Sequence, residues 1–173
     1  FKFPEQTGDA SINDRRGTVD IEVEFGTNVT QLTADFRLSK KATAFVDGIE
    51  QISKSTVNDF TNPVVYTVVA EDGITTQDWI VTVTVEPNSA TDFLSFSFPE
   101  QTQPAEIDTD RHRINIEVAY DADLTNLVAT FELSYGASAW INFFWRQESG
   151  VTPNDFTEPV TYRVIAEDGS TRQ

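Results

Sequence analysis

The 173-residue sequence contains no cysteine and only one histidine, His112. Without cysteine the chain can form no disulfide, no zinc-thiolate site and no cysteine nucleophile. With no second histidine and no cysteine to accompany it, His112 cannot build a zinc site around imidazoles. No apolar run approaches the ~20 residues that a membrane-spanning helix needs. We expect His112 to lie exposed on a strand and this segment to make no direct membrane insertion.

Basic residues are also scarce, with 12 Lys and Arg against 28 Asp and Glu, which gives a formal net charge of −16. The excess is spread along the chain, because residues 1–86 carry −7 and residues 87–173 carry −9. Such a surface repels nucleic acid and anionic membranes, so no nucleic-acid partner is expected. An acidic surface could bind calcium, although a solvated surface is the simpler interpretation.

What the sequence does contain is an internal repeat. The offset between the copies is 95 residues early in the repeat and 96 late, so one residue is inserted between. A period of this size is too long for a solenoid unit and suits one small domain. The repeated stretches are Phe3–Thr7 with Phe98–Thr102, Asn58–Thr61 with Asn154–Thr157, and Ala70–Gly73 with Ala166–Gly169. We expect one domain over 1–86, a short linker over 87–90 and a second domain over 91–173.

The second copy stops at Gln173, the counterpart of Gln77. It therefore lacks the counterpart of Asp78–Val85, which we expect to be the last strand of the first domain. The chain resembles a section of a longer array whose second domain is C-terminally truncated. Supply of that strand by another chain remains an alternative.

Apolar and polar residues alternate with a period of two, which is typical of antiparallel sheets with one buried face. No segment has the pattern of an amphipathic helix. About seven short strands per copy, with Asp72-Gly73 as one hairpin turn, predict an immunoglobulin-like β-sandwich. The fold class is therefore all-β, with two tandem immunoglobulin-like antiparallel β-sandwich domains. The alternating stretches include Val19–Phe25, Leu32–Leu38, Trp79–Val85, Ile114–Tyr120 and Leu127–Leu133.

Residues 58–75 read Asn-Asp-Phe-Thr-x-Pro-Val-x-Tyr-x-Val-x-Ala-Glu-Asp-Gly-x-Thr, and Trp79–Val85 follows. This pattern resembles the tandem immunoglobulin-like (cadherin-like) repeats of Bacteroidetes cell-surface adhesins and lipoproteins, including giant gliding adhesins. The resemblance covers nearly the whole chain. It implies an extracellular, cell-surface location and a non-catalytic role as spacer, adhesive unit or appendage of a glycan-handling protein.

Two pairs of aspartates have spacings that suit oxygen ligation of Ca²⁺. Asp108 and Asp110 form one pair, and Asp121 and Asp123 form the other. The first copy has no matching pairs, so these would be specific to the second domain. The repeated Asp59 and Asp155 are also candidates for an interdomain calcium site, but an Asx-turn is the preferred interpretation.

Adjacent carboxylates at Glu71-Asp72 and Glu167-Asp168 do not indicate catalysis. Neighbouring residues in a turn point apart, whereas acid–base hydrolysis of a glycoside needs two carboxylates that face one bond. We expect the chain not to be an enzyme and to need no cofactor.

The most distinctive local feature is the aromatic segment Trp140–Arg146. The first copy has Phe45–Glu50 there, with an ordinary Asp-Gly turn. We expect Trp140 and Phe45 to be core counterparts. Phe143, Phe144 and Trp145 cannot all be buried at a hairpin tip and are the candidate ligand or partner contacts. Packing on a neighbouring domain and filling of the core remain alternatives.

The main hypothesis from the sequence is a structural or adhesive repeat module, a stalk segment of a long extracellular adhesin or filament. Its partners would be adjacent repeats of the same chain and other cell-surface proteins or glycans. The alternative is a carbohydrate-binding module of a surface glycan-uptake system that uses residues 140–145.

Overall fold

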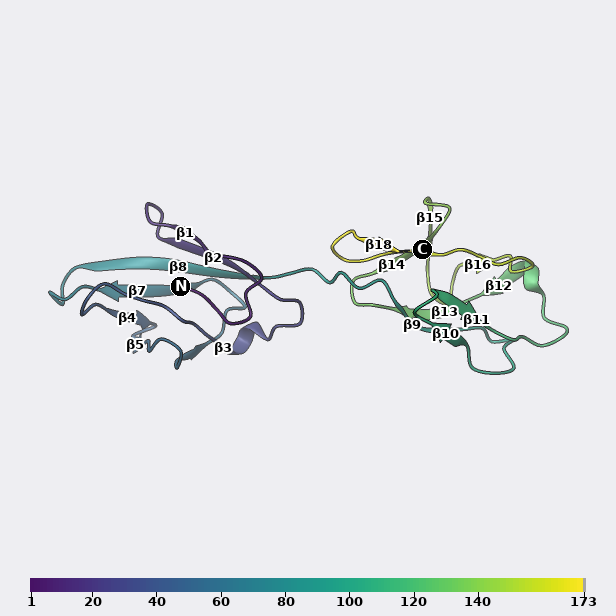
Figure 1. Cartoon of the computed structure of the whole chain (residues 1–173), viewed down its shortest axis with the longest axis horizontal. Helices are drawn as coiled ribbons and strands as arrows, with labels where there is room; N and C mark the ends of the chain where they lie inside the picture. Colours follow the sequence, from purple (N-terminus) through teal and green to yellow (C-terminus); the bar gives the residue numbers. More distant parts are fainter. Residues whose placement is uncertain (173) are drawn as a thin grey trace. The chain divides into compact units, whose positions relative to one another are not determined.

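The computed structural model describes residues 1–172, and the chain divides into two compact units, Phe1–Glu86 and Pro87–Gln173. The all-β prediction is confirmed (Figure 1). The described residues contain no α-helix, and their only helical turns are two 3₁₀ turns, η1 (Val29–Gln31) and η2 (Leu124–Asn126).

The first unit is built on a six-stranded sheet in the order β1-β2-β8-β7-β4-β5, with a small second sheet of β3 and β6. The strands are β1 (Ser11–Asn13), β2 (Thr18–Val23), β3 (Leu32–Thr33), β4 (Thr43–Val46), β5 (Ile49–Glu50), β6 (Val57–Asn58), β7 (Val64–Val69) and β8 (Thr76–Val85).

One pair in this sheet departs from the antiparallel prediction, because β2 and β8 run parallel from Thr18↔Ile80 to Val23↔Val85. Parallel neighbours cannot be joined by a tight hairpin, and here most of the unit lies between them in sequence. Period-two alternation fixes which face of a strand is buried but not the direction of its neighbour.

The described part of the second unit has a counterpart of each strand of the first unit, those of β2, β7 and β8 being shorter, and two further strands, β9 and β13. Its sheets are β15-β14-β17-β18, β13-β9, β10-β11 and β12-β16. The strands are β9 (Phe93–Ser97), β10 (Glu106–Asp108), β11 (Arg113–Asn115), β12 (Leu127–Val128), β13 (Thr130–Leu133), β14 (Ser138–Ile141), β15 (Trp145–Gln147), β16 (Pro153–Asn154), β17 (Arg163–Ile165) and β18 (Thr171–Arg172).

Each unit has its own aromatic core, and the two cores use equivalent residues. Phe3 packs edge-to-face on Phe60 with ring centroids 5.0 Å apart, and Phe98 packs on Phe156 at 4.8 Å. Edge-to-face pairs of this kind add stability beyond the area that they bury. Residues written in both copies therefore hold the fold.

Residues 87–90, which we expected to be a linker, are hydrogen-bonded into the second unit. The Asn88 backbone N–H donates to Glu167 Oε2 (3.0 Å), and Asn88 Nδ2 donates to the Tyr135 carbonyl (3.0 Å). The Asp168 N–H donates back to the Asn88 carbonyl (3.2 Å). Asn88 is consequently buried, at 9% exposure.

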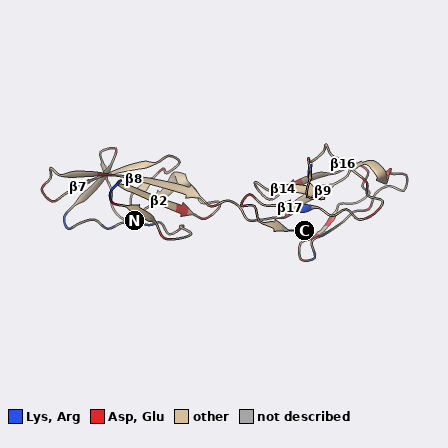
Figure 2. Ribbon diagram, turned by 90° about the horizontal axis from the view of Figure 1, so that it is seen from above, with Lys and Arg blue, Asp and Glu red and all other residues tan. Residues whose placement is uncertain are grey.

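A cavity of about 870 Å³ lies beside the core of the second unit. It is lined by residues of β11 and by Tyr162 and Val164, which are the counterparts of the β2 and β7 residues that flank β8 in the first unit. Of a strand equivalent to β8, the described residues contain only β18. Acidic residues, coloured red in Figure 2, occur in both units.

Candidate functional site

The hairpin of β14 and β15 differs from its counterpart in the first unit. In the first unit Val46 pairs with Ile49 across a two-residue turn, in which Asp47 and Gly48 both have positive φ. In the second unit Ile141 pairs with Trp145, so the loop has three residues, 142–144. The inserted residue therefore lies in this turn.

The longer loop places an aromatic residue in a backbone conformation that usually takes glycine. Asn142 has φ +51° and Phe143 has φ +64°. Asparagine tolerates this left-handed region, but a bulky side chain there is uncommon and its conformation is strained. Strained residues persist only where the surrounding structure holds them, and they concentrate at functional sites.

The structure corrects one prediction about this segment, because Trp140 and Phe45 are not core residues. The alternate positions Ala44 and Ala139 face the cores, each at 1% exposure. Trp140 and Phe45 therefore lie on the opposite face of the sheet, where both are half-buried. Trp140 Nε1 donates to Ser138 Oγ (3.0 Å), which orients its indole ring on this outer face.

Two arginines lie on either side of Trp140 on that face. Trp140 pairs with Arg146 of β15 and with Arg163 of β17, and directly paired residues present their side chains on the same face. The Phe143 ring lies over the Arg163 guanidinium, whose carbon is 3.8 Å from the ring centroid. Arg146, Trp140, Arg163 and Phe143 are called the outer-face cluster below.

The guanidinium of Arg163 is not fully satisfied by the protein. Its Nε atom is buried and has no hydrogen-bond partner among the described residues. Neither Arg163 nor Arg146 belongs to an ion pair within residues 1–172. Buried N–H groups are nearly always paired, so the unpaired Nε–H of Arg163 is an unusual feature of this face.

The three predicted contact residues are all exposed but do not form one platform. Phe143, Phe144 and Trp145 are 59%, 84% and 65% exposed. Phe143 folds over the outer face, whereas Trp145 pairs with Ile141 and so belongs to the other face of the hairpin. Phe144 lies between them at the tip. The segment therefore offers aromatic surface on both sides of the hairpin.

The four predicted calcium ligands are engaged in turns or exposed. Asp108 Oδ1 accepts from the backbone N–H groups of Asp110 and Arg111, and its Oδ2 pairs with Arg111 Nη1 (3.2 Å). Asp123 caps η2, accepting from the Thr125 N–H (3.0 Å) and hydroxyl (2.7 Å).

Asp110 and Asp121 are both exposed. No group of three or more His, Cys, Asp or Glu within residues 1–172 could hold a metal ion. Calcium binding by Asp108, Asp110, Asp121 and Asp123 thus stays a prediction that the described geometry does not support.

The Asx-turn interpretation of the repeated aspartates is confirmed. Asp59 Oδ1 accepts from the Thr61 N–H (2.8 Å) and hydroxyl (2.6 Å), and Asp155 does the same with Thr157 (2.9 and 2.7 Å). The threonine hydroxyl and then its backbone N–H lower the pKa of each carboxyl group.

His112 is exposed, as predicted, but lies in the turn between β10 and β11 instead of on a strand. Its φ is +52°, the conformation that Gly17 adopts in the first unit at +63°. His112 belongs to no group of three or more His, Cys, Asp or Glu within residues 1–172 that could hold a metal ion.

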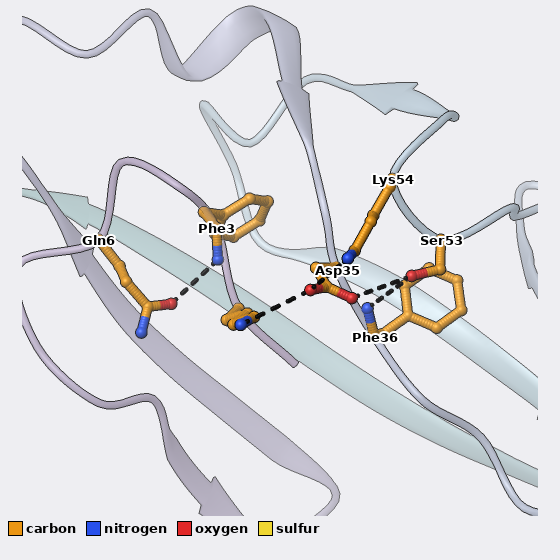
Figure 3. Close-up of polar contacts among 7 residues, drawn as sticks. Phe3, Gln6, Asp35, Phe36, Ser53 and Lys54 are labelled. Carbon is orange, nitrogen blue, oxygen red and sulfur yellow. Dashed lines mark hydrogen bonds and ion pairs between the residues drawn. The ribbon is translucent and has the colours of Figure 1, made fainter.

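A second feature found in one copy only is an ion cluster around Asp35 (Figure 3). Asp35 pairs with Lys54 (3.3 Å) and Lys2 (3.7 Å) and accepts from Ser53 Oγ (3.3 Å). Burial opposes its ionisation, but the hydrogen bond and charge of Lys54, the charge of Lys2 and the Ser53 hydroxyl together lower its pKa.

In the second copy Ser97, Thr130 and Gly150 replace the three charged residues of this cluster. The lysines in the first unit are occupied by Asp35, so the cluster ties the N-terminal segment to the chain near Lys54. The free guanidinium groups of the outer-face cluster are better placed to bind a ligand.

Sequence analysis named Arg146 only as the end of the aromatic segment and did not single out Arg163. A signal was available, since the first copy has Glu50 and Thr67 at those positions. Differences between the copies at alternate strand positions would have drawn attention to the outer face.

A family model described as "SGBP, N-terminal" matches residues 1–83 and again residues 93–173. The chain belongs to this family, which is a type of Bacteroidetes cell-surface glycan-binding protein. Both copies of the internal repeat are thus copies of one family domain.

Among solved structures, the chain is similar to the crystal structure of a proposed glycoside hydrolase from Bacteroides thetaiotaomicron VPI-5482. The identity is 23%, the TM-score is 0.42, and the match covers 65% of this chain and 31% of that chain. The chain therefore spans about a third of that protein's length. No curated protein matches the chain significantly.

The described residues include no helix with the length and apolar character needed to span a membrane.

Proposed function

We propose that the chain is a non-catalytic, glycan-binding part of a surface glycan-uptake system, and that the β14–β15 hairpin binds the glycan. The observation that carries the proposal is the set of exposed aromatic rings Phe143, Phe144 and Trp145 at the tip of this hairpin. Aromatic faces stack on the apolar faces of sugar rings, and exposed aromatic groups of this size mark interaction sites. The family supports the same function.

The first unit supplies an internal control for this proposal. Its equivalent hairpin has Asp47, Gly48 and Ile49 in place of the aromatic residues, on the same sheet and in the same register. Replacing residues 142–144 by Asp-Gly should therefore preserve the fold and remove the Phe143 and Phe144 rings, with Trp145 left in place. Trp145→Ala and Phe144→Ala test the two most exposed rings singly, and Ile49→Ala is the matched control.

The experiment is binding of the purified chain to a panel of soluble polysaccharides by affinity electrophoresis, followed by calorimetry on those that retard it. We expect the Asp-Gly hairpin and Trp145→Ala to weaken binding at least tenfold while the melting temperature stays unchanged. Ile49→Ala should bind as the unaltered chain does. Retention of full affinity by both the Asp-Gly hairpin and Trp145→Ala would exclude the hairpin as the site.

A second candidate function is that of a spacer or adhesive stalk segment. It is supported by the repetition of core and turn residues in both units, which shows that one domain design has been used twice. Adjacent repeats and other surface proteins would be its partners. Absence of binding to any polysaccharide in the panel would favour this function over the first.

A further inference from the structure

Resting on the proposed glycan-binding function, we infer that the outer-face cluster selects sugar chains that carry carboxylate groups, with Arg163 and Arg146 as the anion-binding residues. The inference names the class of glycan, an acidic polysaccharide built from uronic acids. The arginines carry this inference, whereas the proposed glycan binding depends on the aromatic rings alone.

Arg146 and Arg163 are two of the five basic residues of the second unit and lie on one face of its sheet, in a unit with a net charge of −9. The second unit has 14 acidic and 5 basic residues, so its arginines have many possible partners. Arg111 takes one, at Asp108. Arg146 and Arg163 form no ion pair within residues 1–172.

The Arg163 guanidinium is held by the Phe143 ring. Its Nε–H is buried without an acceptor, and the Phe143 ring lies 3.8 Å from its guanidinium carbon. A guanidinium stacked on a ring still presents its N–H groups at its edge, in the planar fork that fits a carboxylate. Because the Nε–H is closed to solvent, a carboxylate of the ligand would bind the Nη groups of Arg163.

The turn that carries Phe143 is strained. Phe143 adopts φ +64° and its ring covers Arg163. A turn of Asp-Gly, as in the first unit, would relieve the strain but leave Arg163 uncovered and free to move. The three-residue loop thus holds the guanidinium in place before a ligand arrives, which lowers the entropy lost on binding.

The charges of Arg146 and Arg163 have a spacing that one polymer chain can span. Arg146 and Arg163 lie on the strands either side of β14, directly across from Trp140, so their backbones are about 10 Å apart. A polymer of uronic acids has a carboxylate on every sugar, so one chain can meet both arginines while a ring stacks on the exposed part of Trp140. A neutral glycan could use the aromatic rings but not the arginines.

The test uses polygalacturonic acid and its fully methyl-esterified form, which have the same sugar backbone with and without charge. The net charge of −9 on the second unit repels a polyanion at long range, so the preference depends on direct contact with the two arginines. We expect the acid form to bind the chain at least tenfold more tightly at 50 mM salt, with the difference shrinking at 500 mM as the arginine–carboxylate contacts are screened. Arg163→Thr and Arg146→Glu install the residues of the first unit and should abolish the preference for the acid. Arg163→Lys keeps the charge without the planar fork and should retain only part of it.

The outcomes separate the two proposals. Equal binding of the acid and the ester, unaffected by Arg163→Thr, would overturn the inference and leave the glycan-binding function standing. Binding of neither polymer nor any other glycan would overturn both. Circular dichroism and melting temperature show whether each variant folds. If Arg163→Thr does not fold, the exposed Arg146→Glu decides, and an unchanged preference in that variant would count against the inference.

Discussion

Gly136 leaves the space that the Glu167 side chain occupies. A Cβ atom placed on Gly136 would lie 2.7 Å from Glu167 Cβ and 2.9 Å from its Cγ and Cδ. The Glu167 carboxylate is thereby able to accept the Asn88 N–H. In the first unit Lys41 stands at the equivalent position and pairs with Glu71 instead.

Gly136→Ala should therefore destabilise the second unit. The new Cβ displaces Glu167, the buried Asn88 N–H loses its acceptor, and alanine is strained at φ +72°. An unsatisfied buried donor and a left-handed non-glycine residue each cost about 1–3 kcal/mol. Hydrogen exchange of the Asn88 amide should accelerate, together with a lower denaturation midpoint. Lys41→Gly in the first unit is the control and should leave Asn88 exchange unchanged.

A polar bridge inside each unit gives a second prediction. Asn58 Nδ2 donates to Gln51 Oε1 (2.7 Å) and to the Tyr66 hydroxyl (3.0 Å). In the second unit Asn154 Nδ2 donates to Gln147 Oε1 at 2.7 Å, but its hydrogen bond to the Tyr162 hydroxyl is longer, at 3.4 Å. Asn58→Ala removes the donor from two buried acceptors and should cost about 1–3 kcal/mol.

Asn154→Ala should cost less than Asn58→Ala, because the bond that it breaks to the tyrosine is longer. Urea denaturation of the two variants, with Trp79 fluorescence reporting on the first unit and Trp140 and Trp145 on the second, measures the difference. Equal losses in the two units would contradict this ranking.

The turn before β2 yields a paired prediction. A Cβ on Gly17 would lie 2.5 Å from the Asp78 carbonyl oxygen, and Gly17 has φ +63°. Gly17→Ala must therefore move β8 away from β2 and should lower the stability of the first unit by about 2 kcal/mol or more. His112→Gly at the equivalent exposed turn removes strain from a φ of +52° and should be neutral or stabilising by up to about 1 kcal/mol. Thermal melting of each variant checks both signs.

Much of the fold could be predicted from the sequence because the strands alternate cleanly. The segment Val19–Val23 has apolar residues only at every second position, so its buried face was unambiguous. In Thr43–Val46 three apolar residues are consecutive, and a period of two cannot then say whether Ala44 or Phe45 is buried. For the same reason, the sequence pattern did not predict that Trp140 faces away from the core.

The rest of the site depends on contacts that no local pattern contains. The stacking of Phe143 on Arg163 joins a turn to a strand 20 residues later, and it follows from the sheet order β15-β14-β17. The docking of Asn88 on Glu167 likewise requires Gly136, whose conformation is visible only once the turn is folded. The sequence alone therefore located the hairpin but did not predict which residues contact it.

High pH should destabilise both units through their buried tyrosines. Burial raises the pKa of Tyr66 and of Tyr162 from 10 to about 12, although the Asn58 and Asn154 hydrogen bonds act in the opposite direction. The native state therefore holds these protons to a higher pH than the unfolded chain does. Their contribution to stability is complete below pH 10 and is lost as the pH rises from about 10 to about 12.

For Tyr66, which is 3% exposed, a shift of this size corresponds to about 2–3 kcal/mol. Urea denaturation at a series of pH values from 8 to 12 should show the first unit weakening above about pH 10. In Tyr66→Phe that decline should disappear from the first unit and persist in the second, where Tyr162 still titrates. A decline of the same size in both units of the variant would mean that other groups, and not the buried phenol, set the alkaline limit.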